Sequence, residues 1–111
     1  MCMNFDDYQK KSRETAIYPN AGKDWIYPTL GLAGEAGEIA NKMKKVIRDK
    51  NGKIDEEVRE SMKGELGDIL WYVAQVATEL NLSLDEIAEK NIEKLSSRKE
   101  RGVIKGSGDN R

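Results

Sequence analysis

Two five-residue segments of this chain are nearly identical, and they restrict how the chain can fold. Residues 34–38 read Gly-Glu-Ala-Gly-Glu, and residues 64–68 read Gly-Glu-Leu-Gly-Asp. Each segment has carboxylates at positions i and i+3, which share one face of an α-helix with Cβ atoms roughly 5–6 Å apart. Four carboxylates on two facing helices repel one another unless a cation lies between them. The pattern therefore predicts two neighbouring helices that hold a metal ion.

Glycine occupies the same two places in both segments, and it is unfavourable inside a helix. Each of the four glycines costs roughly 0.5–1 kcal/mol relative to alanine. We expect them to let the two backbones approach each other closely around the shared ion. The alternative is that both acidic pairs are ordinary features of solvated helices, with Lys42 pairing with Glu38 one turn earlier.

Apolar residues recur at helical spacing in four segments, which predicts an all-α fold. We expect helices over residues 5–17, 28–48 and 56–80, and a fourth that begins at residue 84. Start signals precede or open each of them: Asn4, Pro28, Asp55 and a capping box of Ser83 with Glu86. Residues 1–101 then form one helical domain, and residues 102–111 form a polar tail. The loop before the second helix carries Trp25.

Composition limits both the core and the range of partners. The 111 residues are 35% charged and 38% hydrophobic, so a four-helix arrangement of this size is expected to complete its burial by homo-oligomerisation. A formal net charge of -1 gives no basic surface for a nucleic acid polymer. No apolar run approaches the roughly 18–20 residues that span a membrane, and the first residues lack the pattern of a signal peptide. We therefore expect a cytoplasmic protein.

The absence of histidine limits which metal ligands the chain can offer. With no histidine and a single cysteine, Cys2, the chain offers no imidazole ligand, thiolate zinc site or intramolecular disulfide. Carboxylates are hard oxygen ligands of the kind Mg²⁺ prefers, often together with substrate phosphates. The expected ion is therefore Mg²⁺, with Mn²⁺ as a substitute.

A second polar set lies on the fourth helix. Asn91 falls within its apolar stripe, with Lys94 and Arg98 along the edge, where they are suited to bind the phosphates of a metal-held ligand. The alternative to phosphate binding is that Asn91 is a polar residue tolerated in the core and that Lys94 and Arg98 are ordinary surface cations. Three more residues are expected to contact the substrate. Trp25 would stack on a base, and Lys42 and Tyr72 would face the site.

The pattern Glu35-x-x-Glu38, followed after twenty-six residues by Glu65-x-x-Asp68, resembles the signature of the all-α nucleoside triphosphate pyrophosphohydrolases. Among these enzymes, the pattern is most similar to that of the MazG-like group. Residues 30–38, 91–98 and 101–109 also resemble members of this group. The resemblance implies hydrolysis of a nucleoside triphosphate to the monophosphate and pyrophosphate by a dimer or tetramer. It implies that the four acidic residues are catalytic and hold Mg²⁺, and that the polar residues of the fourth helix contact the triphosphate.

For the reaction we expect water to attack the α-phosphorus, with the base left open among Glu35, Glu38 and Glu65. The nearest alternative is a related diphosphohydrolase specific for dUTP, dCTP or phosphoribosyl-ATP. A di-iron carboxylate bundle is disfavoured because such sites use Glu-x-x-His motifs. A non-catalytic helical interaction module, with acidic segments that only decorate the surface, is the remaining alternative.

Overall fold

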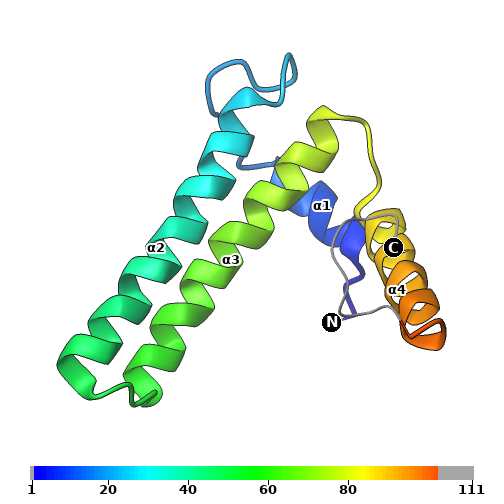
Figure 1. Cartoon of the computed structure of the whole chain (residues 1–111). Helices are drawn as coiled ribbons and strands as arrows, with labels where there is room; N and C mark the ends of the chain where they lie inside the picture. Colours follow the sequence, from blue (N-terminus) through cyan, green and yellow to red (C-terminus); the bar gives the residue numbers. More distant parts are fainter. Residues whose placement is uncertain (1, 103–111) are drawn as a thin grey trace.

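The computed structural model describes residues 2–102, and within them every regular element is a helix. The four helices are α1 (Phe5–Arg13), α2 (Ile26–Lys50), α3 (Glu56–Glu79) and α4 (Leu84–Glu100). Figure 1 shows α2 and α3 as a long antiparallel hairpin, with α1 beside α3 and α4 standing apart from α2. The all-α class is confirmed. Apart from Gly102, the expected tail lies outside the described residues.

The first helix is shorter than its expected range of 5–17. Asn4 caps it as predicted, in a reciprocal capping box with Asp7. After Arg13 the backbone turns more tightly, since the amides of Thr15 and Ala16 donate to carbonyls three residues earlier, and a side chain of α3 contacts this turn. The indole Nε1 of Trp71 donates to the Ser12 carbonyl and to the Thr15 hydroxyl. These contacts close the helix with a tight turn.

The hairpin of α2 and α3 has well-defined ends. Helix α2 starts two residues before Pro28, where Asp24 accepts a hydrogen bond from the Ile26 amide, and it continues to Lys50. Asn51 then adopts a left-handed conformation, which ends the helix. Asp55 caps α3 through the Val58 amide, as expected. The carboxylates of both acidic segments are thereby brought to neighbouring helices.

Helix α4 is fixed at its start by α1. Ser83 accepts from the Glu86 amide, which is one of the two hydrogen bonds of the predicted capping box. The side chains of Asp6 and Gln9 add two further caps from α1, on the amides of Asp85 and Leu84. The apolar stripe of α4 is buried at Leu84, whereas Ile87, Ile92 and Leu95 are exposed.

A buried polar network connects α1 and the following loop to α3. The Glu79 side chain is 2% exposed and accepts from the Arg13 guanidinium, the Tyr18 hydroxyl and the Gly22 amide. Gln75 is fully buried and donates to the Ser12 hydroxyl. Each of these buried groups between α1 and α3 therefore has a partner, which makes the packing of α1 specific.

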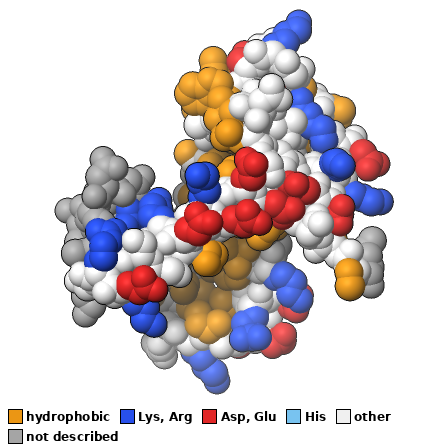
Figure 2. Space-filling view, turned by 90° about the vertical axis from the view of Figure 1, so that its right-hand side faces the viewer, with side chains coloured by type: hydrophobic (Ala, Val, Ile, Leu, Met, Phe, Trp, Pro, Cys, Tyr) orange, Lys and Arg blue, Asp and Glu red, His pale blue; other side chains and the backbone are white. Residues whose placement is uncertain are grey.

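The apolar core of the single chain is small. Its buried hydrophobic side chains are Val46, Val58, Ala74, Ala77 and Leu84. The radius of gyration is 16.8 Å, whereas a compact domain of this length has about 13 Å. Figure 2 shows hydrophobic side chains at the surface, at the upper edge and in a hollow below a band of acidic side chains. The chain alone leaves much apolar surface in water.

Candidate functional site

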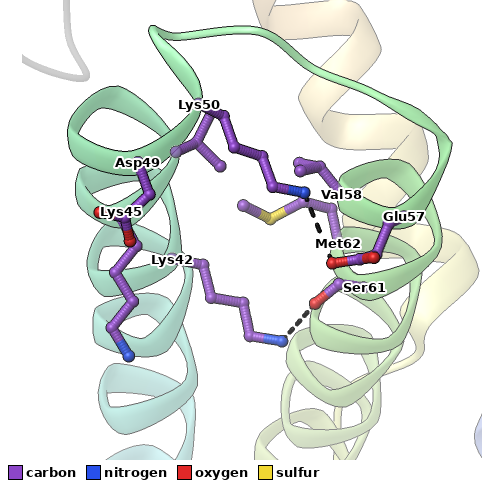
Figure 3. A pocket seen from close by; sticks show the side chains of 9 residues that line it. Lys42, Lys45, Asp49, Lys50, Glu57, Val58, Ser61 and Met62 are labelled. Atoms are coloured by element: carbon purple, nitrogen blue, oxygen red, sulfur yellow. Dashed lines mark hydrogen bonds and ion pairs between the residues drawn. The ribbon is translucent and has the colours of Figure 1, made fainter.

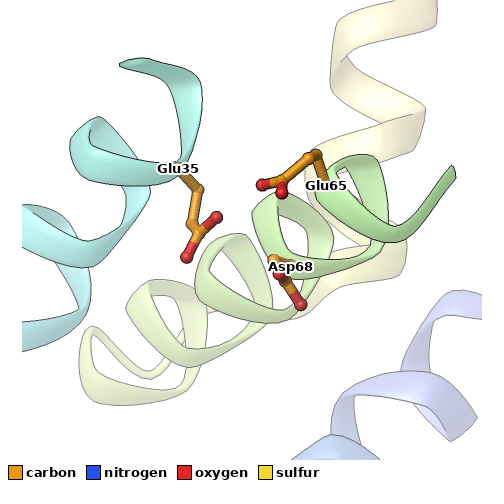
Figure 4. Close-up of side chains that lie close together, drawn as sticks. All are labelled: Glu35, Glu65 and Asp68. Atoms are coloured by element: carbon orange, nitrogen blue, oxygen red, sulfur yellow. The ribbon is translucent and has the colours of Figure 1, made fainter. Parts of the chain in front are cut away.

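Three of the four acidic residues come together between α2 and α3. Glu35 of α2 and Glu65 and Asp68 of α3 each offer one carboxylate oxygen, and these atoms lie within 4.8 Å of one another. Figure 4 shows the three side chains converging on the space between the helices. We call them the acidic group. Glu35 and Glu65 are partly buried and Asp68 is exposed, so the group is open to solvent on one side.

The two glutamates of the acidic group have opposite pKa shifts. The pKa of Glu65 is lowered, chiefly because the Lys42 ammonium donates to it and also because Glu35 can share a proton with it. The pKa of Glu35 is raised, first by that shared hydrogen bond, then by burial and by the charges of Asp68, Glu65 and Glu38. Neighbouring carboxylates oppose each other's ionisation, and a cation between them removes that cost.

One atom of the acidic group has no hydrogen-bond partner. Glu65 Oε1 lies 3.2 Å from Lys42 Nζ, but Glu65 Oε2 is buried and receives no hydrogen bond while Glu35 is ionised. A buried carboxylate oxygen without a donor is unfavourable. A divalent ion with hard oxygen ligands would satisfy it, and Mg²⁺ also keeps positions for water and phosphate. The donor set and the unsatisfied oxygen therefore fit Mg²⁺.

Glu38 is exposed and lies outside the acidic group, although its charge contributes to the raised pKa of Glu35. Its expected alternative partner, Lys42, pairs with Glu65 on the neighbouring helix instead. Lys42 therefore reaches across the hairpin from α2 and does not pair along it.

The expected role of the four repeated glycines is wrong for the single chain. A Cβ atom placed on any of them meets no atom within 4 Å: Gly34, Gly37, Gly64 and Gly67. They leave open surface beside the carboxylates and do not mediate contact between the two backbones. Close approach occurs one turn earlier, where a Cβ atom on Gly31 would lie 2.2 Å from the Tyr72 ring.

Two tyrosines flank the acidic group. The pKa of Tyr72 is raised by burial and then by its neighbours Tyr27, Glu35 and Asp68. The pKa of Tyr8, on α1, is raised by burial and by the charge of Asp68. The sequence pattern indicated Tyr72 because it lies one turn after Asp68. It gave no indication of Tyr8, since only the packing of α1 brings that ring near the group.

Aromatic rings around the start of α2 and on α3 contact one another in a series that does not include Trp25. Tyr18 and Tyr27 stack with centroids 5.4 Å apart, and Trp71 meets both Tyr18 and Tyr72 edge-on. Trp25 is half exposed at the start of α2. The ring stack thus extends from Tyr27 to the tyrosine that borders the acidic group.

The polar residues of α4 lie apart from the acidic group. Asn91 and Lys94 line a separate pocket of about 550 Å³ together with Ser83 and Ile87. Arg98 is 3% exposed on the same helix. None of the residues of that pocket is an acidic-group carboxylate. The described single chain therefore does not bring the two predicted halves of the site together.

Comparison with known proteins shows the family of the chain. The family model described as the MazG nucleotide pyrophosphohydrolase domain matches residues 28–103. The chain belongs to this family. It is also 54% identical over 114 residues to the Gene 37 protein of Mycobacterium phage L5, with 98% of this chain and 100% of that protein covered. No solved structure matches the chain.

Members of the MazG family are nucleotide pyrophosphohydrolases and generally depend on a divalent metal. Membership of this family supports hydrolase activity for the chain at the level of the family. The matched MazG segment covers α2 from Pro28 onward together with α3 and α4, includes all four acidic positions, and begins after α1. No helix within residues 2–102 is both long and apolar enough to cross a membrane.

Proposed function

We propose that this protein hydrolyses a nucleoside triphosphate to the nucleoside monophosphate and pyrophosphate in a Mg²⁺-dependent reaction. The observation that carries the proposal is the acidic group with its buried, donor-free Glu65 oxygen, within a chain of the MazG family. Glu35, Glu65 and Asp68 would hold the ion, and Glu38 would join them as an exposed fourth carboxylate. Mn²⁺ would substitute for Mg²⁺.

When bound, Mg²⁺ supplies positive charge that orients the phosphates and stabilises the charge that develops on them. A water oxygen forms a bond to the α-phosphorus, and the bond from that phosphorus to the bridging oxygen of pyrophosphate breaks. The proton of the water goes to one of three carboxylates, Glu35, Glu38 or Glu65. The open, partly buried position of the group gives water and triphosphate access from the solvent side.

Six residues would contact the nucleotide. Cations and an amide on α4 suit phosphate oxygens, since arginine offers a planar fork and lysine a point charge. Aromatic rings suit the base and sugar, and the ring of Tyr72 already borders the acidic group. The proposed substrate residues are Asn91, Lys94, Arg98, Lys42, Tyr72 and Trp25.

A homo-oligomer, either a dimer or a tetramer, would bring these parts together. Along one face of the hairpin runs a groove of about 630 Å³ whose apolar lining includes Ile39, Met43 and Leu66, with charged residues at its rim. Leu66 is 58% exposed and Ile47, one turn beyond Met43, is 68% exposed. A second copy has the same face, so two hairpins packed together would bury both. Helix α4 of one copy would then be free to approach the acidic group of another.

Alternative functions make different predictions for this geometry. A related diphosphohydrolase that prefers dUTP, dCTP or phosphoribosyl-ATP would use the same acidic group with another base or sugar site. A non-catalytic helical module has no need for a buried glutamate oxygen without a donor, so the group favours an enzyme. The protein would act in the cytoplasm on free nucleotides, with neither a nucleic acid polymer nor a membrane as partner.

The test is an assay of the purified protein with ordinary, deoxy and modified triphosphates, with and without Mg²⁺, in which all products are identified. The expected products are a nucleoside monophosphate and pyrophosphate in equal amounts, formed only with the metal. Release of orthophosphate, or no turnover of any nucleotide, would contradict the proposal. The preferred nucleotide separates the general activity from its dUTP, dCTP and phosphoribosyl-ATP relatives.

A further inference from the structure

We propose that Lys42 and Ser61 are positioning residues for the acidic group. Lys42 holds one oxygen of Glu65, so that the other oxygen is presented to the metal ion, and Ser61 holds the Lys42 ammonium in place. This inference rests on the proposed function. It extends it by giving Lys42 a role toward the metal ligand, separate from any contact with substrate.

The contacts that support this role cross the hairpin. Lys42 extends from α2 to α3, where its Nζ donates to the Ser61 hydroxyl and lies 3.2 Å from Glu65 Oε1. Figure 3 shows the Lys42 side chain reaching Ser61 in the space between the two helices. Ser61 and Glu65 are one helical turn apart on the same face of α3, so a single ammonium group can bind both.

These contacts leave the two oxygens of Glu65 in different states. Oε1 is paired with Lys42, while Oε2 is buried without a donor. Figure 4 shows the Glu65 carboxylate turned toward Glu35 across the space between the helices. The side chain of Glu65 is only 16% exposed, so its orientation is restricted by its surroundings. The free oxygen is thereby held ready for a cation before any nucleotide binds.

Removal of the Lys42 ammonium has two effects of opposite sign. Loss of the contact with Oε1 frees the Glu65 carboxylate to rotate, and loss of an outer partner of this kind typically weakens metal binding about 10–100-fold. Loss of a positive charge near the ion also removes a repulsion, which would tighten binding. A positioning role requires the first effect to dominate. Replacement of Ser61 leaves the charge in place and tests the positioning alone.

The experiment is a titration of the nucleotide-free, full-length protein with Mn²⁺, in which free Mn²⁺ is measured by electron paramagnetic resonance. The Kd of the Lys42→Met variant is expected to rise about 10–100-fold. The Ser61→Ala variant is expected to show a smaller rise, and Lys42→Arg, which keeps a cationic donor, should bind more tightly than Lys42→Met. Lys44→Met is the matched control, since it removes the same charge from an exposed position of α2.

Three outcomes would overturn the inference. Unchanged or tighter Mn²⁺ binding by both Lys42→Met and Ser61→Ala would show that the contacts do not orient Glu65. A raised nucleotide KM with wild-type Mn²⁺ affinity would assign Lys42 to the substrate and leave the proposed function intact. Wild-type protein that binds no Mn²⁺ would overturn both. Circular dichroism identifies a variant that fails to fold, and if Lys42→Met fails, Ser61→Ala decides.

Discussion

Two glutamates of α3 show how a structural carboxylate differs from a candidate ligand. Glu79 is 2% exposed, and its oxygens accept from Arg13, Tyr18 and Gly22. Glu65 is also largely buried, yet one of its oxygens has no donor. Since buried polar groups in native proteins are nearly always paired, the unsatisfied oxygen is the observation that favours Glu65 as a metal ligand.

Replacement of a single carboxylate tests the catalytic role directly. Asp68→Asn and Glu38→Gln should each reduce Mg²⁺-dependent pyrophosphate release by more than about 100-fold, since even outer partners of a metal ligand are worth 10–100-fold. The helix content seen by circular dichroism should not change, because both residues are exposed. Turnover close to that of the wild type in either variant would count against the acidic site.

Two glycines of α2 should respond to alanine in opposite ways. Gly31→Ala places a Cβ atom against the Tyr72 ring and should lower the free energy of unfolding by about 1–3 kcal/mol, as overpacking does. Gly34→Ala meets no neighbouring atom and should raise it by about 0.5–1 kcal/mol through helix propensity. Chemical denaturation of both variants measures the difference. Equal effects would mean that Tyr72 does not occupy the space beside Gly31.

At the scale of helices, the sequence was sufficient to predict those helix ends that depend on neighbouring residues alone. Asn4, Asp55 and Ser83 cap the helices that they were expected to cap, because a cap depends on residues within one turn. The end of α1 was predicted too late, and the turn that follows this helix lies against Trp71, which is distant in the sequence. Caps given to α4 by Asp6 and Gln9 were not predictable for the same reason.

The packing of α1 on α3 should depend on pH through Glu79. Burial alone would raise its pKa, but hydrogen bonds from Gly22, Tyr18 and Arg13 hold the pKa below the ordinary value of 4.5. This stabilisation is therefore fully present above about pH 4.5 and is lost as the pH falls toward the lowered pKa. Unfolding measured from pH 7 to pH 3 should show a smaller acid-induced loss of stability for Glu79→Gln than for the wild type. Identical losses would contradict the assignment.

At the scale of the whole molecule, the single chain does not bring Asn91 and Lys94 of α4 to the acidic group. The periodicity of α2 and α3 predicted that both acidic segments would border an apolar face, and Glu35, Glu65 and Asp68 do converge there. It did not predict that α4 stands apart from α2 (Figure 1), since sequence periodicity does not reveal which partner covers an apolar face. The extended shape and exposed apolar groove support completion by other copies of the chain.

Disruption of the exposed apolar face tests this assembly. Ile47→Glu places a charge on that face, more than two helical turns from the acidic group. The wild type is expected to be a dimer or tetramer by sedimentation equilibrium, and the variant should dissociate and lose pyrophosphate release while it keeps its helix content. A wild type that is monomeric and fully active would contradict completion of the site by a second copy.

The most direct test of the metal site is the anomalous diffraction of crystals grown with Mn²⁺. A peak is expected between α2 and α3, within about 2.0–2.6 Å of carboxylate oxygens from Glu35, Glu65 and Asp68, the range of oxygen ligands around Mg²⁺ and Ca²⁺. Crystals of Asp68→Asn, prepared in the same way, should show a weaker peak or none. Absence of a peak at this position in the wild-type protein, with the ion bound elsewhere or not at all, would contradict the metal-dependent mechanism.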